Sequence, residues 1–286
     1  MSSAEDARVS VLDRGFLYGD AAFEVLRTFG GRFADLDLHV DRLVRSTELL
    51  RFIRRPSPEA LTDAIVGTVA RRTGESYVRV VVTRGTSAVP TLDLDVGPEP
   101  NVVVYAFPLV LPPARVYAEG ISLVTIPSLR AVEHTSATSA KVTSYLANLL
   151  AKDDARRLGA DEALFATPGG DVTECASANV FAVFGDEVVT PPLATGVLPG
   201  ITRRHVLACA SSVGLVARER TVPLADLVRA DEVFVTSSIR GIVPVARVDG
   251  GRTFARRNPD FPRTNALRRD HETRQKEAAD RGFRVE

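Results

Sequence analysis

Residues 134–150 read HTSATSAKVTSYLANLL, a run of small, polar and apolar residues that carries one lysine, Lys141. Of the 36 basic residues in the chain only three are lysines, and the other two, Lys152 and Lys276, lie among charged neighbours. An amine held out of water loses its proton more readily, and only the neutral amine attacks a carbonyl carbon. Lys141 is therefore a candidate Schiff-base lysine. The alternative is a lysine at the start of a helix over residues 141–159, whose ammonium extends to water.

Hydrophobic periodicity on both sides of this stretch predicts a mixed α+β protein. Before residue 111 the expected elements are strands at 9–15, 21–36 (a pair around a Gly-Gly turn), 77–85 and 101–110, with helices at 39–53 and 58–72. After residue 120 they are strands at 121–127, 162–168, 178–185, 187–192, 215–221 and 232–237, with helices at 141–159, 201–213, 225–230 and 265–283.

Pro112 and Pro113 interrupt this pattern, because consecutive prolines disfavour both a helix and a central strand. We therefore expect a small α+β domain over residues 1–110, a linker over residues 111–119 and a larger domain over residues 120–286. The larger domain would then carry Lys141.

Composition removes several classes of protein. The 36 acidic residues balance the 36 basic ones, so no global field attracts nucleic acid. No apolar run approaches the roughly 18 to 20 residues that span a bilayer, and the first ten residues do not read as a signal peptide. Cys175 and Cys209 are too few for a disulfide framework and are expected to be buried apolar residues. We expect a cytoplasmic protein with no nucleic-acid or membrane partner and no metal site.

Glu174 follows Lys141 by 33 residues, in the segment TECASANVF. A carboxylate beside a pyridine nitrogen keeps that nitrogen protonated and makes the ring an electron sink, as a pyridoxal phosphate enzyme requires. The alternative is an exposed glutamate in a loop. Glu174 becomes a stronger candidate only together with the segments that follow.

The segment GVLPGITRR places Gly200, Ile201 and Thr202 at the start of a predicted helix. Free backbone N–H groups and the positive end of the helix dipole favour an anion there. Glycine before a helix is more often only a cap, so this segment alone is weak evidence.

A second candidate segment for binding phosphate is VTSSIRG, which places Thr236, Ser237 and Ser238 at the end of a strand. Arg42, in HVDRL on an otherwise apolar helix face, could close such a site as a phosphate clamp. In a chain this rich in arginine, a surface role for Arg42 is the alternative.

The motifs DRGFLYGDAAFEVLR, HVDRL, an isolated lysine with SYLANLLAKDDA, TECASANVF, LPGITR and FVTSS with IVPV occur in this order between about residues 9 and 248. Together they resemble the class IV (fold type IV) pyridoxal phosphate aminotransferases. This family includes branched-chain and D-amino-acid aminotransferases, aminodeoxychorismate lyases and R-selective amine aminotransferases. The resemblance implies a small N-terminal α/β domain and a larger C-terminal domain with a β-barrel-like core.

The resemblance also implies roles for individual residues. Lys141 would form the internal aldimine with pyridoxal 5′-phosphate and carry the proton between the substrate Cα and the cofactor. Glu174 would keep the pyridine nitrogen protonated, and Tyr145 would lie near the cofactor. The phosphate would be held by Arg42, Ile201, Thr202, Ser237 and Ser238. Family members are usually homodimers with the active site at the subunit interface, so the resemblance implies that Phe23 and Arg27 line a substrate site, that of the neighbouring subunit.

The subfamily depends on how the substrate carboxylate is held. The segment TRGTSAVPTLDLD lacks the Arg and His that form a carboxylate trap in the well-known D-amino-acid enzymes. The segment YVRVV keeps Tyr77 and Arg79 of the branched-chain Y-x-R-P motif but not its proline. Three arginines could provide a different carboxylate site: Arg27, Arg79 and Arg84.

We therefore expect transamination between an amino acid, with D-alanine or D-glutamate as the preferred type, and a 2-keto acid through pyridoxamine phosphate. An aminodeoxychorismate lyase, which eliminates pyruvate, and a branched-chain L-amino acid aminotransferase are the alternatives. A scaffold that binds the cofactor without turnover is a further alternative, and the presence of both Lys141 and Glu174 argues against it.

Overall fold

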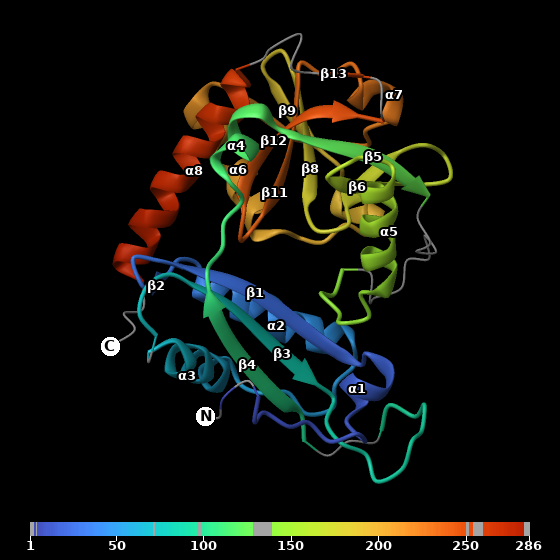
Figure 1. The fold of residues 1–286 in the computed structure, drawn as a ribbon, viewed down its shortest axis with the longest axis vertical. Helices are drawn as coiled ribbons and strands as arrows, with labels where there is room; N and C mark the ends of the chain where they lie inside the picture. Colours follow the sequence, from blue (N-terminus) through green and yellow to red (C-terminus); the bar gives the residue numbers. More distant parts are fainter. Residues whose placement is uncertain are drawn as a thin grey trace. The chain divides into compact units, whose positions relative to one another are not determined.

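The computed structural model describes residues 3, 5–70, 72–95, 99–127, 139–249, 252–253 and 260–282. Its contacts divide the chain into two compact units, coloured along the sequence in Figure 1. The first unit comprises residues 1–110, 135–145 and 275–286, and the second comprises residues 111–134 and 146–274.

The described part of the first unit is built on four antiparallel strands in the order β2-β1-β3-β4. Its elements are α1 (Arg14–Tyr18), β1 (Ala21–Phe29), β2 (Arg32–Phe33), α2 (Leu36–Leu49), α3 (Pro58–Val69), β3 (Ser76–Thr83) and β4 (Asn101–Pro108).

Helices α2 and α3 cover one face of this sheet (Figure 1). Alternate residues of the strands point toward them, because side chains in a strand alternate between the two faces. The resulting core contains Ala22 and Leu26 of β1, Val78 and Val80 of β3, and apolar residues of both helices. The opposite face of β1 therefore carries Phe23, Val25 and Arg27.

The second unit contains a larger sheet of nine strands among the described residues, in the order β10-β9-β8-β11-β12-β5-β6-β7, with β13 paired to β12. Its strands are β5 (Ile121–Pro127), β6 (Glu162–Ala166), β7 (Val172–Cys175), β8 (Asn179–Phe184), β9 (Glu187–Thr190), β10 (Val216–Glu219), β11 (Glu232–Ser237), β12 (Gly241–Val248) and β13 (Arg252–Thr253). Its helices are α4 (Ala114–Glu119), α5 (Leu146–Arg157), η1 (Leu193–Thr195), α6 (Ile201–Cys209), η2 (Ala210–Val213) and α7 (Leu224–Leu227).

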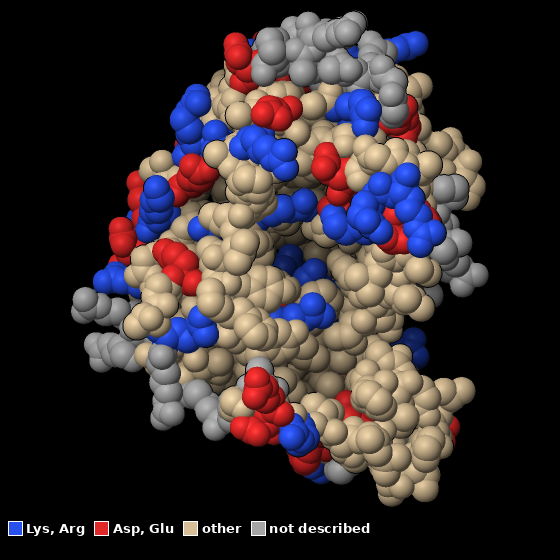
Figure 2. All heavy atoms as spheres, in the orientation of Figure 1, with Lys and Arg blue, Asp and Glu red and all other residues tan. Residues whose placement is uncertain are grey.

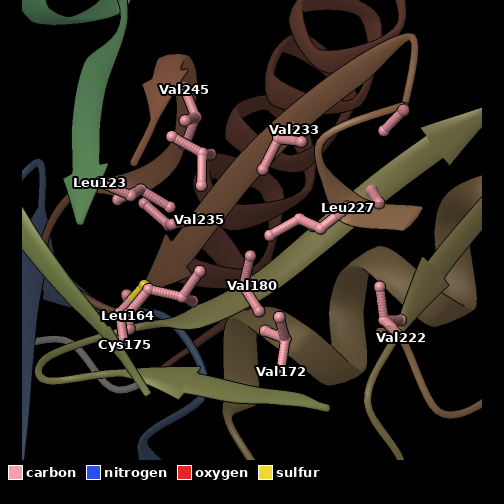
Figure 3. Packing of buried hydrophobic residues seen from close by; sticks show 14 of the residues in the cluster. Leu123, Leu164, Val172, Cys175, Val180, Val222, Leu227, Val233, Val235 and Val245 are labelled. Carbon is pink, nitrogen blue, oxygen red and sulfur yellow. The ribbon is translucent and has the colours of Figure 1, made fainter. Parts of the chain in front are cut away.

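This larger sheet curls toward closure. β7 is the last strand of the order and β8 the third, yet the N–H of Cys175 at the end of β7 donates to the carbonyl of Ala178 just before β8, at 2.8 Å. The curl encloses a core of β-branched and leucine side chains. Figure 3 shows Leu123, Leu164, Val180 and Val235 converging inside it. The observed mixture of helices and strands confirms the α+β expectation.

The unit boundaries differ from the expected ones in three places. The stretch expected to be a linker at 111–119 contains α4, and Val116 and Tyr117 of that helix pack on the core of the second unit. Residues 139–145, with Lys141, group with the first unit rather than with the larger C-terminal one. The chain from residue 275 onward does the same: the Gln275 amide donates to Asp35 Oδ2 at 2.6 Å.

The charged segment near the C-terminus forms α8 (Pro262–Arg281), as expected. Its surface carries ion pairs one turn apart, Arg268 with Glu272 and Arg274 with Asp270. On the face drawn in Figure 2, basic and acidic side chains are interspersed.

None of the described helices is long and apolar enough to cross a membrane. Cys175 and Cys209 are both free and buried, which confirms the prediction for them.

Candidate active site

The backbone of Lys141 is held at the edge of β1. The N–H of Phe23 donates to the Lys141 carbonyl at 2.9 Å, and the N–H of Thr143 donates to the Ala21 carbonyl at 3.0 Å. The helix expected over residues 141–159 is shorter in the structure, where α5 begins only at Leu146. Strand β2 pairs only with Thr28 and Phe29 of β1. The same edge of β1 can therefore pair with residues 141–143 at residues 21–23. Residues 134–138 lie outside the described residues.

The side chain of Lys141 lies among aromatic rings. Its Nζ atom is 4.4 Å from the centroid of the Phe23 ring and 5.9 Å from that of Tyr145. The two rings meet edge to face at 5.5 Å. Aromatic faces attract a cation and also fix the direction of a flexible side chain. Lys141 is thus half-buried, and contacts of both its backbone and its side chain set the direction of the amine.

Two of the three candidate arginines share the sheet face of Phe23. Arg79 of β3 pairs with Val25, and its Cζ atom is 4.1 Å from the Phe23 ring centroid. Since Lys141 Nζ is 4.4 Å from the same centroid, the two atoms are at most 8.5 Å apart, the sum of the two distances. Arg79 Nε is buried without a hydrogen-bond partner among the described residues. Arg27 lies on the same face, with its Cζ atom 4.2 Å from the Phe29 ring centroid.

The structure does not bring Arg84 into this group. Its guanidinium donates to Asp20 Oδ2 at 2.7 Å, to the Leu50 carbonyl at 2.7 Å and to the Arg51 carbonyl at 3.0 Å, and lies over the Phe52 ring. The side chain is only 4% exposed. These contacts make Arg84 a buried structural residue that joins three segments of the first unit.

Arg42 is oriented by a buried glutamate. Arg42 Nε and Nη2 donate to the two carboxylate oxygens of Glu24 at 2.7 and 2.8 Å, a bidentate arrangement. His39, one turn earlier on α2, places Nδ1 2.7 Å from Glu24 Oε2. Sequence analysis did not identify Glu24 or His39. One feature of the sequence could have identified Glu24: it is a carboxylate among the alternate residues of β1 that face the core.

Burial and charge act in opposite directions on this group. Burial raises the pKa of Glu24, but the Arg42 charge and the hydrogen bonds from Arg42 and His39 outweigh it and hold the pKa well below its usual range. Burial lowers the pKa of His39, and the Glu24 carboxylate only partly offsets this. His39 is therefore neutral near pH 7, with Nδ1–H donating to Glu24.

Glu174, at the end of β7 in the second unit, is connected to the loop ahead of α6. Its Oε2 atom accepts from the Leu198 N–H at 3.0 Å and from Asn179 Nδ2 at 3.4 Å. The same Asn179 amide donates to the Leu198 carbonyl at 2.9 Å. Asn179 was not predicted as a site residue. It fixes the carboxylate relative to the loop that begins α6.

The start of α6 fits an anion. Gly200 is its N-cap, no acidic residue lies in its first turn, and Ile201 and Thr202 are buried there. The first amides of a helix have no acceptor within the helix. A Cβ atom at Gly200 would lie 2.1 Å from Asn179 Oδ1, so only glycine fits against the residue that holds Glu174.

Ser237 and Ser238 lie at the tight turn between β11 and β12, where Ser237 pairs with Gly241. Gly241 has a φ of 66°, a conformation that favours glycine. The hydroxyl of neighbouring Thr236 is buried without a hydrogen-bond partner among the described residues. Arg240, another residue not predicted from the sequence, contacts the Ser237 hydroxyl with both its backbone N–H and its Nε, at 3.4 Å each.

Comparisons with known proteins show which family this chain resembles. Residues 21–248 match the family described as amino-transferase class IV. A D-alanine aminotransferase of Bacillus licheniformis is 32% identical over 248 residues, which cover 86% of this chain and 84% of the relative. A branched-chain-amino-acid aminotransferase of Salmonella typhimurium is 31% identical over 257 residues, which cover 86% and 82%.

Among solved structures, the branched-chain amino acid aminotransferase of Escherichia coli superposes with a TM-score of 0.88 and 27% identity, over 98% of this chain and 93% of that one. This likeness confirms the fold type IV architecture. The chain belongs to the class IV aminotransferases, a pyridoxal phosphate-dependent family.

Proposed function

We propose that this aminotransferase transfers the amino group of an α-amino acid, with D-alanine or D-glutamate as the preferred type of donor, to a 2-keto acid. The observation that carries the proposal is that Lys141 and Arg79 contact the same Phe23 ring. A nucleophilic amine and a guanidinium that can bind a carboxylate thus lie near one aromatic ring on the same face of the sheet. The known relatives support the general reaction, and the donor itself is our inference.

The residues present fit pyridoxal phosphate. The buried hydroxyl of Thr236, which has no hydrogen-bond partner in the described part of the chain, and the first amides of α6 are donors of the kind that a phosphate accepts. Gly200 lets the start of α6 lie against Asn179, where a Cβ atom would clash. We assign the phosphate to Ile201, Thr202, Ser237 and Ser238, together with Arg42 as Glu24 orients it. When bound, the cofactor supplies a protonated pyridine ring that accepts electrons from the substrate Cα.

Lys141 and Glu174 have the two central roles in this proposal. The neutral amine of Lys141 would hold the cofactor at rest and, when free, would take the proton from the substrate Cα. The hydrogen bonds between its backbone and β1 keep the lysine in place for both roles. The Glu174 carboxylate, fixed by Leu198 and Asn179, keeps the ring nitrogen protonated.

We assign the substrate carboxylate to Arg79. Its stacking on Phe23 holds the guanidinium plane in one orientation, while its Nε has no partner among the described residues to displace. Arg27 lies on the same face and is the second choice. Arg84 is no longer a candidate, because its donors are used by Asp20, Leu50 and Arg51.

The preference for D-amino acids draws support from the D-alanine aminotransferase of Bacillus licheniformis. A branched-chain L-amino acid donor is the second candidate, and the retained Tyr77 and Arg79 together with the Salmonella typhimurium relative favour it. Aminodeoxychorismate lyase is the third. Steady-state assays with 2-oxoglutarate and, separately, D-alanine, D-glutamate (with pyruvate as acceptor) and L-leucine separate the first two candidates. Turnover of L-leucine alone would move the enzyme to the branched-chain group.

We also propose that the chain works as a homodimer. Helix α5 exposes Leu146, Leu149 and Leu150, which lie on one side of the helix at three- and four-residue spacing. This apolar row follows directly after Lys141 in the chain, so a second copy packed there would shield the neighbourhood of the site. Light scattering of the purified protein should give twice the chain mass, and Leu149→Glu should give the monomer mass.

A further inference from the structure

We propose that Arg240 is a positioning residue for the cofactor. With Glu162 and Ser177 it ties the turn that carries Ser237 and Ser238 to the turn that follows Glu174. The spacing between the phosphate contacts and the ring-nitrogen contact is thereby fixed. This inference rests on the proposed function, which assigns those serines and Glu174 to the cofactor.

The contacts of Arg240 reach both turns. Its Nη2 donates to Ser177 Oγ at 3.0 Å and to Glu162 Oε2 at 3.3 Å, while its Nε and backbone N–H contact Ser237 Oγ at 3.4 Å. Ser177 lies three residues after Glu174, in the turn between β7 and β8. One guanidinium therefore bridges a serine of each turn.

Glu162 is the buried carboxylate that Arg240 contacts in this bridge. Its side chain is fully buried at the start of β6, and its Oε2 also accepts from Ser177 Oγ at 2.5 Å and from Lys152 Nζ at 3.2 Å. A buried carboxylate without its cations is costly, so Glu162 favours the position in which Arg240 reaches it. The Tyr117 hydroxyl adds a bond to the Arg240 carbonyl at 3.1 Å.

The backbone aligns the two turns, and the Arg240 side chain joins their polar groups. The turn after β7 leads into β8, which pairs with β11 so that Asn179 lies opposite Thr236. This ladder places the backbones of the two turns but fixes no side chain. Arg240 adds the contact between the serine hydroxyls, so a ligand that contacts both turns meets groups that are already placed.

The test is the affinity of the apoprotein for pyridoxal phosphate, measured by titration of intrinsic tyrosine fluorescence and by absorbance. Arg240→Met should raise the dissociation constant by about tenfold to a hundredfold, as is typical when a residue that orients ligand-binding groups is removed. Arg240→Lys should recover part of the loss. Arg263→Met, which removes the Arg263–Asp186 ion pair of the same unit, should leave the constant unchanged.

A role in stability alone gives a different result. In that case Arg240→Met would lower the melting temperatures of apoprotein and holoprotein equally and leave the dissociation constant at the wild-type value, which overturns the inference. Glu162→Gln with Arg240→Met should weaken binding no more than the worse single variant, because both remove one bridge. If Arg240→Met does not fold, Ser177→Ala and Arg240→Lys carry the same comparison. Failure of the wild-type apoprotein to bind pyridoxal phosphate would instead overturn the proposed function.

Discussion

Lys141 contacts Phe23 in two ways, through its backbone and through its side chain. The Lys141 carbonyl accepts the Phe23 N–H at 2.9 Å, and Lys141 Nζ lies 4.4 Å from the centroid of the Phe23 ring. A residue of β1 therefore sets both the position of the lysine backbone and the direction of its amine. Catalysis by an amine gains from such fixed geometry, because the reacting atoms need no further ordering.

Replacing Lys141 tests the identity of the nucleophile. We expect Lys141→Ala to lose the visible absorption of the bound cofactor and to lower the transamination rate by about a thousandfold or more, since both nucleophile and base are removed. Lys276→Ala, at an exposed position on α8, is the matched control and should keep both properties. Near-normal turnover in Lys141→Ala would show that another amine does the chemistry.

Arg79 and Arg84 should respond in opposite ways to the same substitution. Arg79→Met should lower kcat/KM for amino acids by roughly tenfold to a hundredfold, while activity toward R-1-phenylethylamine, which lacks a carboxylate, changes little. Arg84→Met should leave kcat/KM nearly intact but destabilise the fold by about 1 to 3 kcal/mol, because Asp20 keeps Arg14 but loses Arg84, and the Leu50 and Arg51 carbonyls lose their donor. Kinetics and urea unfolding of both variants check this. Equal losses for amine and amino acid in Arg79→Met would remove Arg79 from the carboxylate site.

Glu174→Gln should lower kcat by about a hundredfold or more while the protein still binds the cofactor, because a neutral amide no longer favours a protonated ring nitrogen. Single-turnover kinetics with the amino donor isolate this step. Asp171→Asn, a nearby change on the loop before β7, serves as the control. A Glu174→Gln enzyme with wild-type single-turnover rates would mean that another group protonates the ring.

Much of the architecture follows from local sequence signals. The glycine before Ile201 and the apolar spacing after it predicted the helix at 201–213, which the structure divides into α6 and η2. The prediction was wrong for Lys141, because the helical pattern of the leucines after it was extended backward over residues 141–145. Residues 141–143 instead pair with β1, which lies more than a hundred positions earlier in the chain. Local periodicity contains no information about such a partner.

The same limit explains the site residues that were not predicted. Glu24, Asn179 and Arg240 each act through a partner brought close by the fold, so none has a local motif. For Arg84 the residue type was read correctly as a carboxylate binder, but the carboxylate is that of Asp20 in the same unit. Residue chemistry was thus predictable, whereas the assignment of partners required the structure.

Stability should fall as the pH decreases through the range in which histidine titrates. His39 has a folded-state pKa below its ordinary value of 6.5, so below about that pH the unfolded chain binds a proton that the folded chain does not. Acid therefore favours unfolding. Glu24, whose pKa is also depressed, adds to the loss only at more acidic pH, below its ordinary value of 4.5.

Urea unfolding at pH 7 and pH 5.5 measures this effect. The drop in unfolding free energy between the two values should be smaller in His39→Gln than in the wild type, since glutamine does not titrate. His205→Gln, on the partly exposed side of α6, is the comparison for a general effect of removing a histidine. An identical drop in His39→Gln and the wild type would show that His39 is protonated equally in both states.

The most direct test of the central claim is the visible absorption spectrum of the purified protein, with D-alanine, L-leucine and R-1-phenylethylamine added in separate cuvettes. We predict a yellow protein that D-alanine bleaches, because amino transfer to the cofactor ends its conjugation with Lys141. Bleaching by L-leucine instead would place the enzyme in the branched-chain group. A protein that stays colourless after pyridoxal phosphate is added, or a yellow one that no amino acid bleaches, would contradict the account.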